Sequence, residues 1–286
     1  MYIKSSFPDQ AKVPDCNAYE ALWNRHEQAG CPDDLILHIE GISGRKRTYQ
    51  EFRTRAVLVA TALGSPVSDG FLGVHEKGEM IAIISHNSLV REVSQHWSLI
   101  HCDFQDYAVL VHSLLLLATP FALFNPFWTP FEFEYALKLT KPTRVIVQDQ
   151  LLPTLVPMTE NIVGMENIYI LGQKIEGFRN LEEMLEDARS RGMDSASPRP
   201  AKKDTLAYLV FSSGTTGFPK GRCNAHHCFY NYSLHLLAVM ISHGNIISSV
   251  NKSEFRSGFG PNSVSVYLLD WTMRSTSAAD RKCRTG

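Results

Sequence analysis

Residues 206–221 read LAYLVFSSGTTGFPKG, an apolar run of strand length that passes directly into a loop of small and hydroxyl-bearing residues. In this loop Gly214 and Gly217 allow tight turns that expose backbone N–H groups, and Lys220 adds a mobile positive charge. Hydroxyl groups supply further hydrogen-bond donors at four positions, Ser212, Ser213, Thr215 and Thr216. The stretch therefore predicts a phosphate-binding loop at the end of a buried strand.

The residues around the lysine separate this loop from the Walker A loop. The spacing from Gly214 to Lys220 fits that pattern, but Pro219 occupies the place of the glycine before the lysine. Gly221 stands where a Walker A loop has the serine or threonine that binds magnesium. The pattern indicates a different class of phosphate-binding protein.

Upstream of the loop, helical patterns alternate with short apolar runs. Helix starts are expected at three caps, Thr48, Thr129 and Asn180, and the first of these forms a capping-box pattern with Glu51. Strands are expected at four runs, residues 79–85, 144–148, 167–172 and 206–212. Because strands that alternate with helices usually form a parallel sheet, we predict an α/β fold whose mostly parallel sheet is flanked by helices.

The most apolar stretch, residues 109–124, does not predict a membrane span. It is shorter than the roughly 20 residues that a spanning helix needs, and it contains His112 and Pro120. We interpret it as a buried helix followed by a strand, and we expect no transmembrane segment.

Composition narrows the classes of partner and compartment. A formal net charge of -1 and a pI near 6.8 provide no basic surface for nucleic acid. The amino terminus shows no evident secretory or transit signal, and the six cysteines lack the spacing of a disulfide framework. These features favour a cytoplasmic protein with free thiols.

The loop and its upstream sequence resemble the adenylate-forming, AMP-binding superfamily, which contains acyl-CoA synthetases of the 4-coumarate-CoA-ligase kind, luciferases and peptide-synthetase adenylation domains. Beside SSGTTGFPKG, the resemblance rests on TYQEF at 48–52, EMIAIISHNS at 79–88 and FNPFWTPFEFEYALKLTKPTRVIV at 124–147. It extends over residues 10–250 and implies the amino-terminal part of the family's large α/β domain.

The resemblance implies that ATP activates a carboxylic acid as acyl-AMP, and that the thiol of coenzyme A then displaces AMP. The implied partners are ATP, Mg2+, coenzyme A and a small-molecule carboxylic acid, with no nucleic acid. In that scheme Ser212, Ser213, Thr215 and Thr216 donate to the β- and γ-phosphates. Lys220 would balance the phosphate charge, while Gly214 and Gly217 would let the backbone approach closely. No catalytic side chain is assigned.

Two segments interrupt the resemblance, at residues 90–105 and 222–238. The first has sixteen residues, begins with valine and ends with glutamine, as a translated intron bounded by GT and CAG would. We hypothesise that both segments are translated introns. The remainder divides into a partial AMP-binding domain over residues 1–250 and an unrelated tail over 251–286 that we expect to be disordered.

Three further features of the sequence bear on the expected activity. Residues 251–286 carry none of the family's acyl-pocket or lid motifs, so the chain is expected to be truncated and inactive alone. The segment CNAHHC at 223–228 matches no zinc-site spacing and lies inside the second interruption, so no metal site is predicted. His243 is interpreted as a helix-start or packing residue and not as a base.

Two alternatives stay open. The chain could be a non-catalytic fragment with residual nucleotide binding, or it could derive from the adenylation domain of a peptide-synthetase-like enzyme that uses a carrier protein. A peroxisomal location also stays open for an intact form.

Overall fold

The computed structural model describes residues 12–28, 30, 32–39, 46–74, 79–86, 107–159, 162–211 and 238–257. The helices of these residues are α1 (Ala18–Gln28), α2 (Tyr49–Gly64), α3 (Tyr107–Leu116), α4 (Pro130–Thr140), α5 (Leu152–Thr159), α6 (Leu181–Ser190) and α7 (His243–Ser257). The strands are β1 (Ile36–Ile39), β2 (Lys46–Thr48), β3 (Ile81–Ile84), β4 (Phe121–Phe124), β5 (Arg144–Gln148), β6 (Ile168–Leu171), β7 (Arg179–Asn180), β8 (Leu206–Phe211) and β9 (Ala238–Ser242). Short 3-10 turns lie at Val67–Asp69, Asp149–Leu151 and Met165–Asn167.

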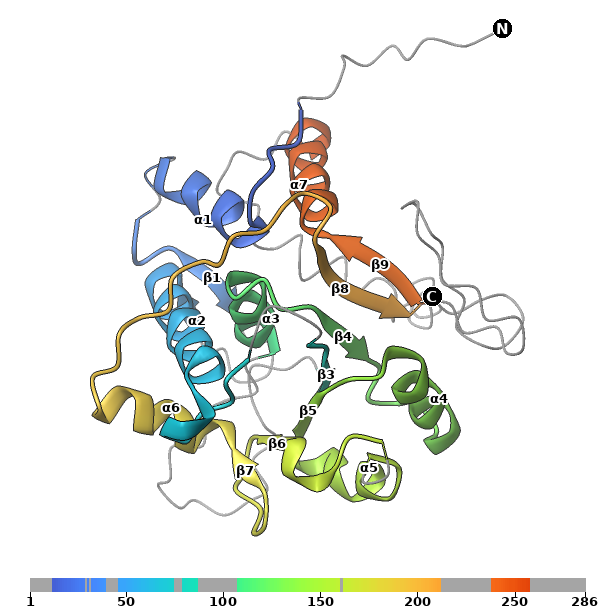
Figure 1. Cartoon of the computed structure of the whole chain (residues 1–286). Coiled ribbons are helices and arrows are strands. Elements are labelled where there is room, and N and C mark those ends of the chain that lie inside the picture. Colours follow the sequence, from blue (N-terminus) through green and yellow to red (C-terminus); the bar gives the residue numbers. More distant parts are fainter. Residues whose placement is uncertain are drawn as a thin grey trace, which may run out of the picture.

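Seven strands form one sheet in the order β7-β6-β5-β3-β4-β8-β9 (Figure 1). The neighbouring strands are parallel from β7 to β8, and β9 pairs antiparallel with β8. A separate antiparallel pair joins β1 and β2. The expected α/β fold, with a mostly parallel sheet flanked by helices, is confirmed.

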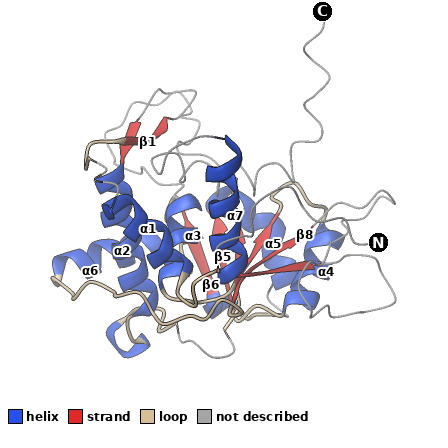
Figure 2. Ribbon diagram, turned by 90° about the horizontal axis from the view of Figure 1, so that it is seen from above, coloured by secondary structure: helices blue, strands red, loops and turns tan. Residues whose placement is uncertain are grey.

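Helices cover both faces of this sheet (Figure 2). One core packs α1, α2, α3 and α6 against Ile81 and Ile83 of β3, and the other packs α4 and α5 against Ala82 and Ile84. Successive side chains of a strand point to opposite faces, so β3 must be apolar at every position to serve both cores. This is why its sequence is a continuous apolar run.

The three expected helix starts are confirmed. The Thr48 side chain accepts the Glu51 N–H at 3.2 Å, and the Glu51 carboxylate accepts the Thr48 N–H at 2.8 Å. Thr129 and Glu132 make the same reciprocal pair of bonds ahead of α4. Asn180 Oδ1 accepts the first backbone N–H groups of α6. These caps satisfy donors that a helix cannot pair within itself.

The expected strands are confirmed with small changes at their ends. β5 coincides with residues 144–148, while β3, β6 and β8 lie within the three other expected ranges. The apolar stretch 109–124 forms most of α3 and then β4, as expected. None of the helices in the described ranges is long and apolar enough to cross a membrane.

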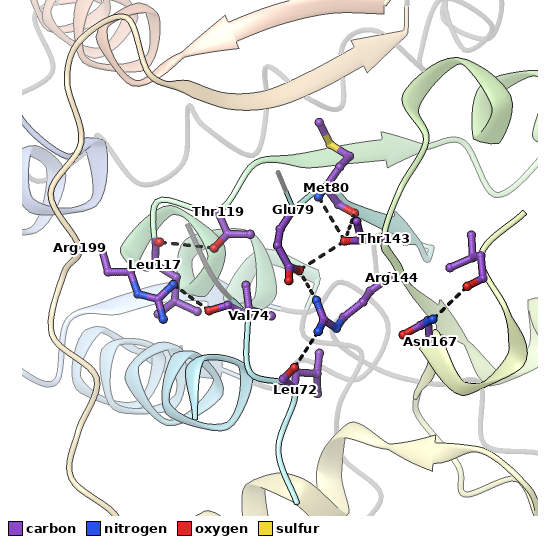
Figure 3. Close-up of polar contacts among 11 residues, drawn as sticks. Leu72, Val74, Glu79, Met80, Leu117, Thr119, Thr143, Arg144, Asn167 and Arg199 are labelled. Atoms are coloured by element: carbon purple, nitrogen blue, oxygen red, sulfur yellow. Dashed lines mark hydrogen bonds and ion pairs between the residues drawn. The ribbon is translucent and has the colours of Figure 1, made fainter. Parts of the chain in front are cut away.

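Polar contacts close the amino ends of the central strands (Figure 3). Glu79, just before β3, forms an ion pair with Arg144 at the start of β5, and Arg144 also donates to the Leu72 carbonyl at 2.9 Å. The side chains of the pair are only 13% and 14% exposed. Thr143 donates to the Met80 carbonyl at 3.3 Å. This edge of the sheet is therefore held by structural contacts.

Residues 192–204 form a loop that is tied to the body of the molecule. Arg199 donates from its side chain to the Val74 carbonyl at 2.9 Å and from its backbone to the Leu116 carbonyl at 2.8 Å. The Ala196 N–H donates to the Thr61 hydroxyl at 2.9 Å. These bonds favour a fixed connection between α6 and β8 over a hinge.

The first prediction concerns the ion pair at the amino edge. Arg144→Ala should lower the free energy of unfolding by about 2–3 kcal/mol, because it leaves the Glu79 carboxylate largely buried without its cation. Denaturant unfolding followed by circular dichroism measures the change. The matched control is Lys138→Ala, which breaks an exposed pair with Glu134 and should cost less than about 0.5 kcal/mol. Equal losses in the two variants would contradict the prediction.

The strands on either side of the second expected interruption are directly paired. Phe211, the last residue of β8, lies opposite Ala238, the first residue of β9. Residues 212–237 connect them and lie outside the described residues, as do residues 87–106 around the first interruption. The paired ends are compatible with a shorter connection between the two strands.

A second prediction follows from this pairing. Deleting residues 222–237 shortens the connection from 26 residues to the ten residues 212–221 and leaves Ala238 in its ladder. Loop-closure entropy alone should then raise the free energy of unfolding by about 1 kcal/mol. Chemical denaturation of both proteins tests this. A variant that no longer folds would show that the deleted residues belong to the core, against the intron hypothesis.

Candidate functional site

The carboxyl edge of the parallel strands contains a topological switch point. β3 leads to α3, which packs in one core, whereas the adjacent strand β4 leads to α4 in the core on the opposite face. These two neighbouring strands are therefore followed by helices on opposite faces of the sheet. In open α/β sheets, ligands bind at the carboxyl ends of the strands at such a point.

The ends of β3 and β5 are joined by one amide side chain. Gln148 Oε1 accepts the backbone N–H of His86 at 2.9 Å and the Ser85 hydroxyl at 3.4 Å. Gln148 is 1% exposed. Because a buried amide must be paired, this contact fixes where the chain leaves β3.

The neighbouring ends of β5 and β6 are joined by a carboxylate. Asp149 accepts the N–H of Gln150 at 2.8 Å and the N–H of Gln173 at 3.1 Å. Gly172 lies so close that an added Cβ would be 3.1 Å from the Asp149 carboxyl carbon, and its φ of +111° disfavours other residues. The Asp149 carboxylate thus serves to close this part of the edge.

Aromatic rings occupy the switch point itself. The ring of His86, after β3, lies 5.0 Å from the ring of Phe127, after β4. Asn125 stabilises the turn that follows β4, because its side-chain oxygen accepts the Phe127 N–H at 2.9 Å. Phe127 is 81% exposed, so the ring pair lies at the surface of the carboxyl edge.

The expected phosphate-binding residues lie outside the described part of the chain. These are Ser212, Ser213, Gly214, Thr215, Thr216, Gly217 and Lys220. The strand before them is described: β8 runs parallel to β4, with Tyr208 opposite Phe121 and Val210 opposite Leu123. Since parallel strands end at the same edge, the chain enters this segment at the edge that carries the switch point.

The segment CNAHHC at 223–228 also lies outside the described residues. Within the described ranges, no group of three or more histidine, cysteine, aspartate or glutamate side chains could hold a metal ion.

His243 begins α7 and is fully buried. Its Nδ1 accepts the backbone N–H of Ala18 at 2.9 Å, which places the imidazole proton on Nε2. Its own N–H donates to the Thr205 carbonyl at 3.0 Å. The next residue, Gly244, packs so tightly that an added Cβ would be 2.7 Å from the Lys203 carbonyl oxygen. These contacts support the expected helix-start and packing role.

Gln148 ends the expected strand 144–148, and His86 lies in the segment EMIAIISHNS at 79–88. The sequence alone did not predict a role for either side chain. Gln148 is the last residue of β5 and His86 lies two residues after β3, and a polar residue at the carboxyl end of an apolar strand is the available signal. The sequence could not predict that Gln148 and His86 form a hydrogen bond, because this contact depends on β3 and β5 being neighbours in the sheet.

The third prediction concerns pH. Burial lowers the pKa of His243 from 6.5 to about 4, so the unfolded chain takes up a proton at a higher pH than the folded chain. The free energy of unfolding should therefore fall by up to about 3 kcal/mol as the pH drops from 6.5 to 4. His243→Asn retains a side-chain acceptor for Ala18 but cannot titrate. Denaturant unfolding across this range should show a shallower decline for the variant; parallel profiles would refute the assignment.

Comparisons with known proteins point to one family. The AMP-binding enzyme family matches residues 105–235. Benzoate–CoA ligase of Thauera aromatica is 27% identical over 140 residues, which are 48% of this chain and 25% of that ligase. N-(5-amino-5-carboxypentanoyl)-L-cysteinyl-D-valine synthase of Penicillium rubens is 26% identical over 233 residues, 80% of this chain and 5% of that synthase.

A long-chain-fatty-acid–CoA ligase structure from Archaeoglobus fulgidus shares the fold. It matches 90% of this chain and 42% of its own with a TM-score of 0.64 and 18% sequence identity. The family match and these relatives support a fragment similar to the adenylate-forming, AMP-binding superfamily. The chain spans a quarter or less of the length of the two curated relatives described above.

Proposed function

We propose that this chain binds MgATP at the carboxyl edge of its sheet and provides the phosphate-binding part of an acid-activating ligase. The observation that carries the proposal is the position of β8. This strand lies parallel to β4 and ends at Phe211, so SSGTTGFPKG begins at the edge that carries the switch point between β3 and β4. A phosphate-binding sequence at a switch point is the arrangement expected of a nucleotide site.

The described surroundings are compatible with a bound triphosphate. Asp149 directly follows β5 and Glu132 lies in the first turn of α4, and both carboxylates accept hydrogen bonds from backbone N–H groups. Asp149 accepts two of them, and Glu132 accepts the Thr129 N–H at 2.8 Å. Each carboxylate is thus committed to a local turn or cap, which reduces its repulsion of an incoming anion.

The residue roles in this proposal follow from the chemistry of the loop. Hydroxyl groups of Ser212, Ser213, Thr215 and Thr216 would donate to the β- and γ-phosphates, and Lys220 would offset their charge. Gly214 and Gly217 would allow backbone N–H groups to approach the phosphate oxygens. Magnesium would enter with the nucleotide and neutralise further charge.

The proposed reaction is the activation of a carboxylic acid. A carboxylate oxygen forms a bond to the α-phosphorus of ATP, the bond to the bridging oxygen breaks, and pyrophosphate leaves with the electron pair. Negative charge on the phosphates rises in this step, so fixed donors and cations lower its barrier. In the second step a thiolate attacks the acyl carbon, the bond from that carbon to the oxygen that bridges it to phosphorus breaks, and AMP leaves with this oxygen and the electron pair.

The acceptor thiol distinguishes two versions of the second step. Coenzyme A is favoured by the match to benzoate–CoA ligase. A thiol on a carrier protein is the alternative, and the match to the Penicillium synthase over 80% of this chain favours it. A chain that binds ATP without turnover is the third reading.

The fourth prediction tests the nucleotide site. Lys220→Ala should weaken MgATP binding at least about tenfold, because a cation beside the phosphates is lost. Isothermal titration calorimetry of the purified chain measures the affinity. Lys174→Ala, which removes an exposed lysine after β6, is the control and should leave the affinity unchanged.

ATP–pyrophosphate exchange, measured with aryl, medium-chain and long-chain acids, then separates a catalytic chain from one that only binds. Exchange with any of these acids supports acid activation. Binding without exchange supports the non-catalytic reading, and a wild-type chain with no affinity for MgATP refutes the proposal.

A further inference from the structure

The turn between β4 and α4 holds one aromatic side chain in a defined place. Thr129 caps α4, so Trp128 precedes the cap and Phe133 is the fourth residue of the helix. The two rings lie 5.8 Å apart, which is the contact of a hydrophobic staple. The Trp128 N–H also donates to the Asn125 carbonyl at 3.1 Å. Capping box, staple and turn together fix the position of Trp128.

From this position Trp128 reaches across the sheet to β8. Its ring lies 5.0 Å from that of Phe211 in an edge-to-face arrangement, with 80° between the ring planes. Phe124 of β4 lies 5.5 Å from Phe211 and 5.6 Å from Trp128. The three rings form an aromatic cluster in which each contacts the other two, and Phe211 is 8% exposed.

The backbone of β8 loses one of its two neighbours at this place. Its ladder with β4 ends at the pair Leu123 and Val210, whereas its ladder with β9 continues to Phe211 and Ala238. On the β4 side, the last residue of β8 is therefore held by ring contacts and not by the ladder. Aromatic pairs of this geometry contribute beyond the area that they bury.

We propose that Trp128 is a positioning residue, which fixes the end of β8 and thereby the point and direction at which the phosphate-binding loop leaves the sheet. The inference rests on the proposed nucleotide-binding role of residues 212–220. It makes the β4–α4 turn, more than eighty residues earlier in the chain, a determinant of nucleotide affinity.

Three variants of Trp128 and one control test the proposal. Trp128→Ala removes the ring, Trp128→Leu retains apolar contact with Phe133 without a ring, and Trp128→Phe retains an aromatic ring. Phe131→Ala is the matched control, since Phe131 is an aromatic residue of the same helix start and is 54% exposed. The full chain is used throughout, and circular dichroism confirms folding.

Hydrogen exchange of a peptide that covers β8 and the following residues gives a readout that needs no nucleotide. Exchange there should be at least about fivefold faster in Trp128→Ala and Trp128→Leu, and unchanged in Trp128→Phe and Phe131→Ala. Peptides from β5 and β6 should exchange as in the wild type. If the alanine variant does not fold, the comparison of the leucine and phenylalanine variants decides.

MgATP affinity gives the second readout. We expect a loss of about tenfold in the alanine and leucine variants, with affinity retained within about threefold in Trp128→Phe. Unchanged exchange in the leucine variant overturns the positioning role, whether or not ATP binds. If the wild-type chain does not bind ATP but exchange at β8 is faster in the variants, Trp128 still positions β8 and the proposed nucleotide site is refuted. Faster exchange with wild-type ATP affinity would overturn the link between Trp128 and nucleotide binding.

Discussion

The parallel backbone ladder between β4 and β8 is the constraint on which the proposed site depends. It brings a strand that begins at Leu206 beside one that begins at Phe121, and both strands end at the same edge. Any sequence that follows β8 must therefore start next to the turn that follows β4. The chemistry of SSGTTGFPKG would have no defined surroundings without this pairing.

The two edges of the sheet use their polar residues differently. At the amino edge, Arg144 joins the start of β5 to the segment before β3 and to the Leu72 carbonyl (Figure 3). At the carboxyl edge, Gln148 and Asp149 hold the strand ends by accepting backbone N–H groups. The charged pair at the amino edge is largely buried, and Arg144 makes its contacts to Glu79 and Leu72 within the chain. The carboxyl edge instead retains an exposed ring at Phe127, where a ligand can approach.

Contacts between residues close together in the sequence were predicted well, and contacts between distant residues were not. Caps such as Thr48 depend on neighbours three residues away, so those helix starts were predictable. The short strands β1, β2 and β7 were missed, because two to four residues carry too little pattern. For the site, the loop sequence was predictable, but the contact of Trp128 with Phe211, the residue before the loop, requires the strand order. No periodicity in the sequence encodes that order.

The bond between the Ala18 N–H and His243 joins residues that are 225 positions apart. During synthesis, α1 emerges first and has to wait for nearly all of the described chain before this partner exists. Trp23 of α1 already contacts Phe52 of α2 and His112 of α3, so this side of α1 can pack before α7 is made. The amino-terminal helix can therefore dock in two stages during synthesis, first on α2 and α3 and last on α7.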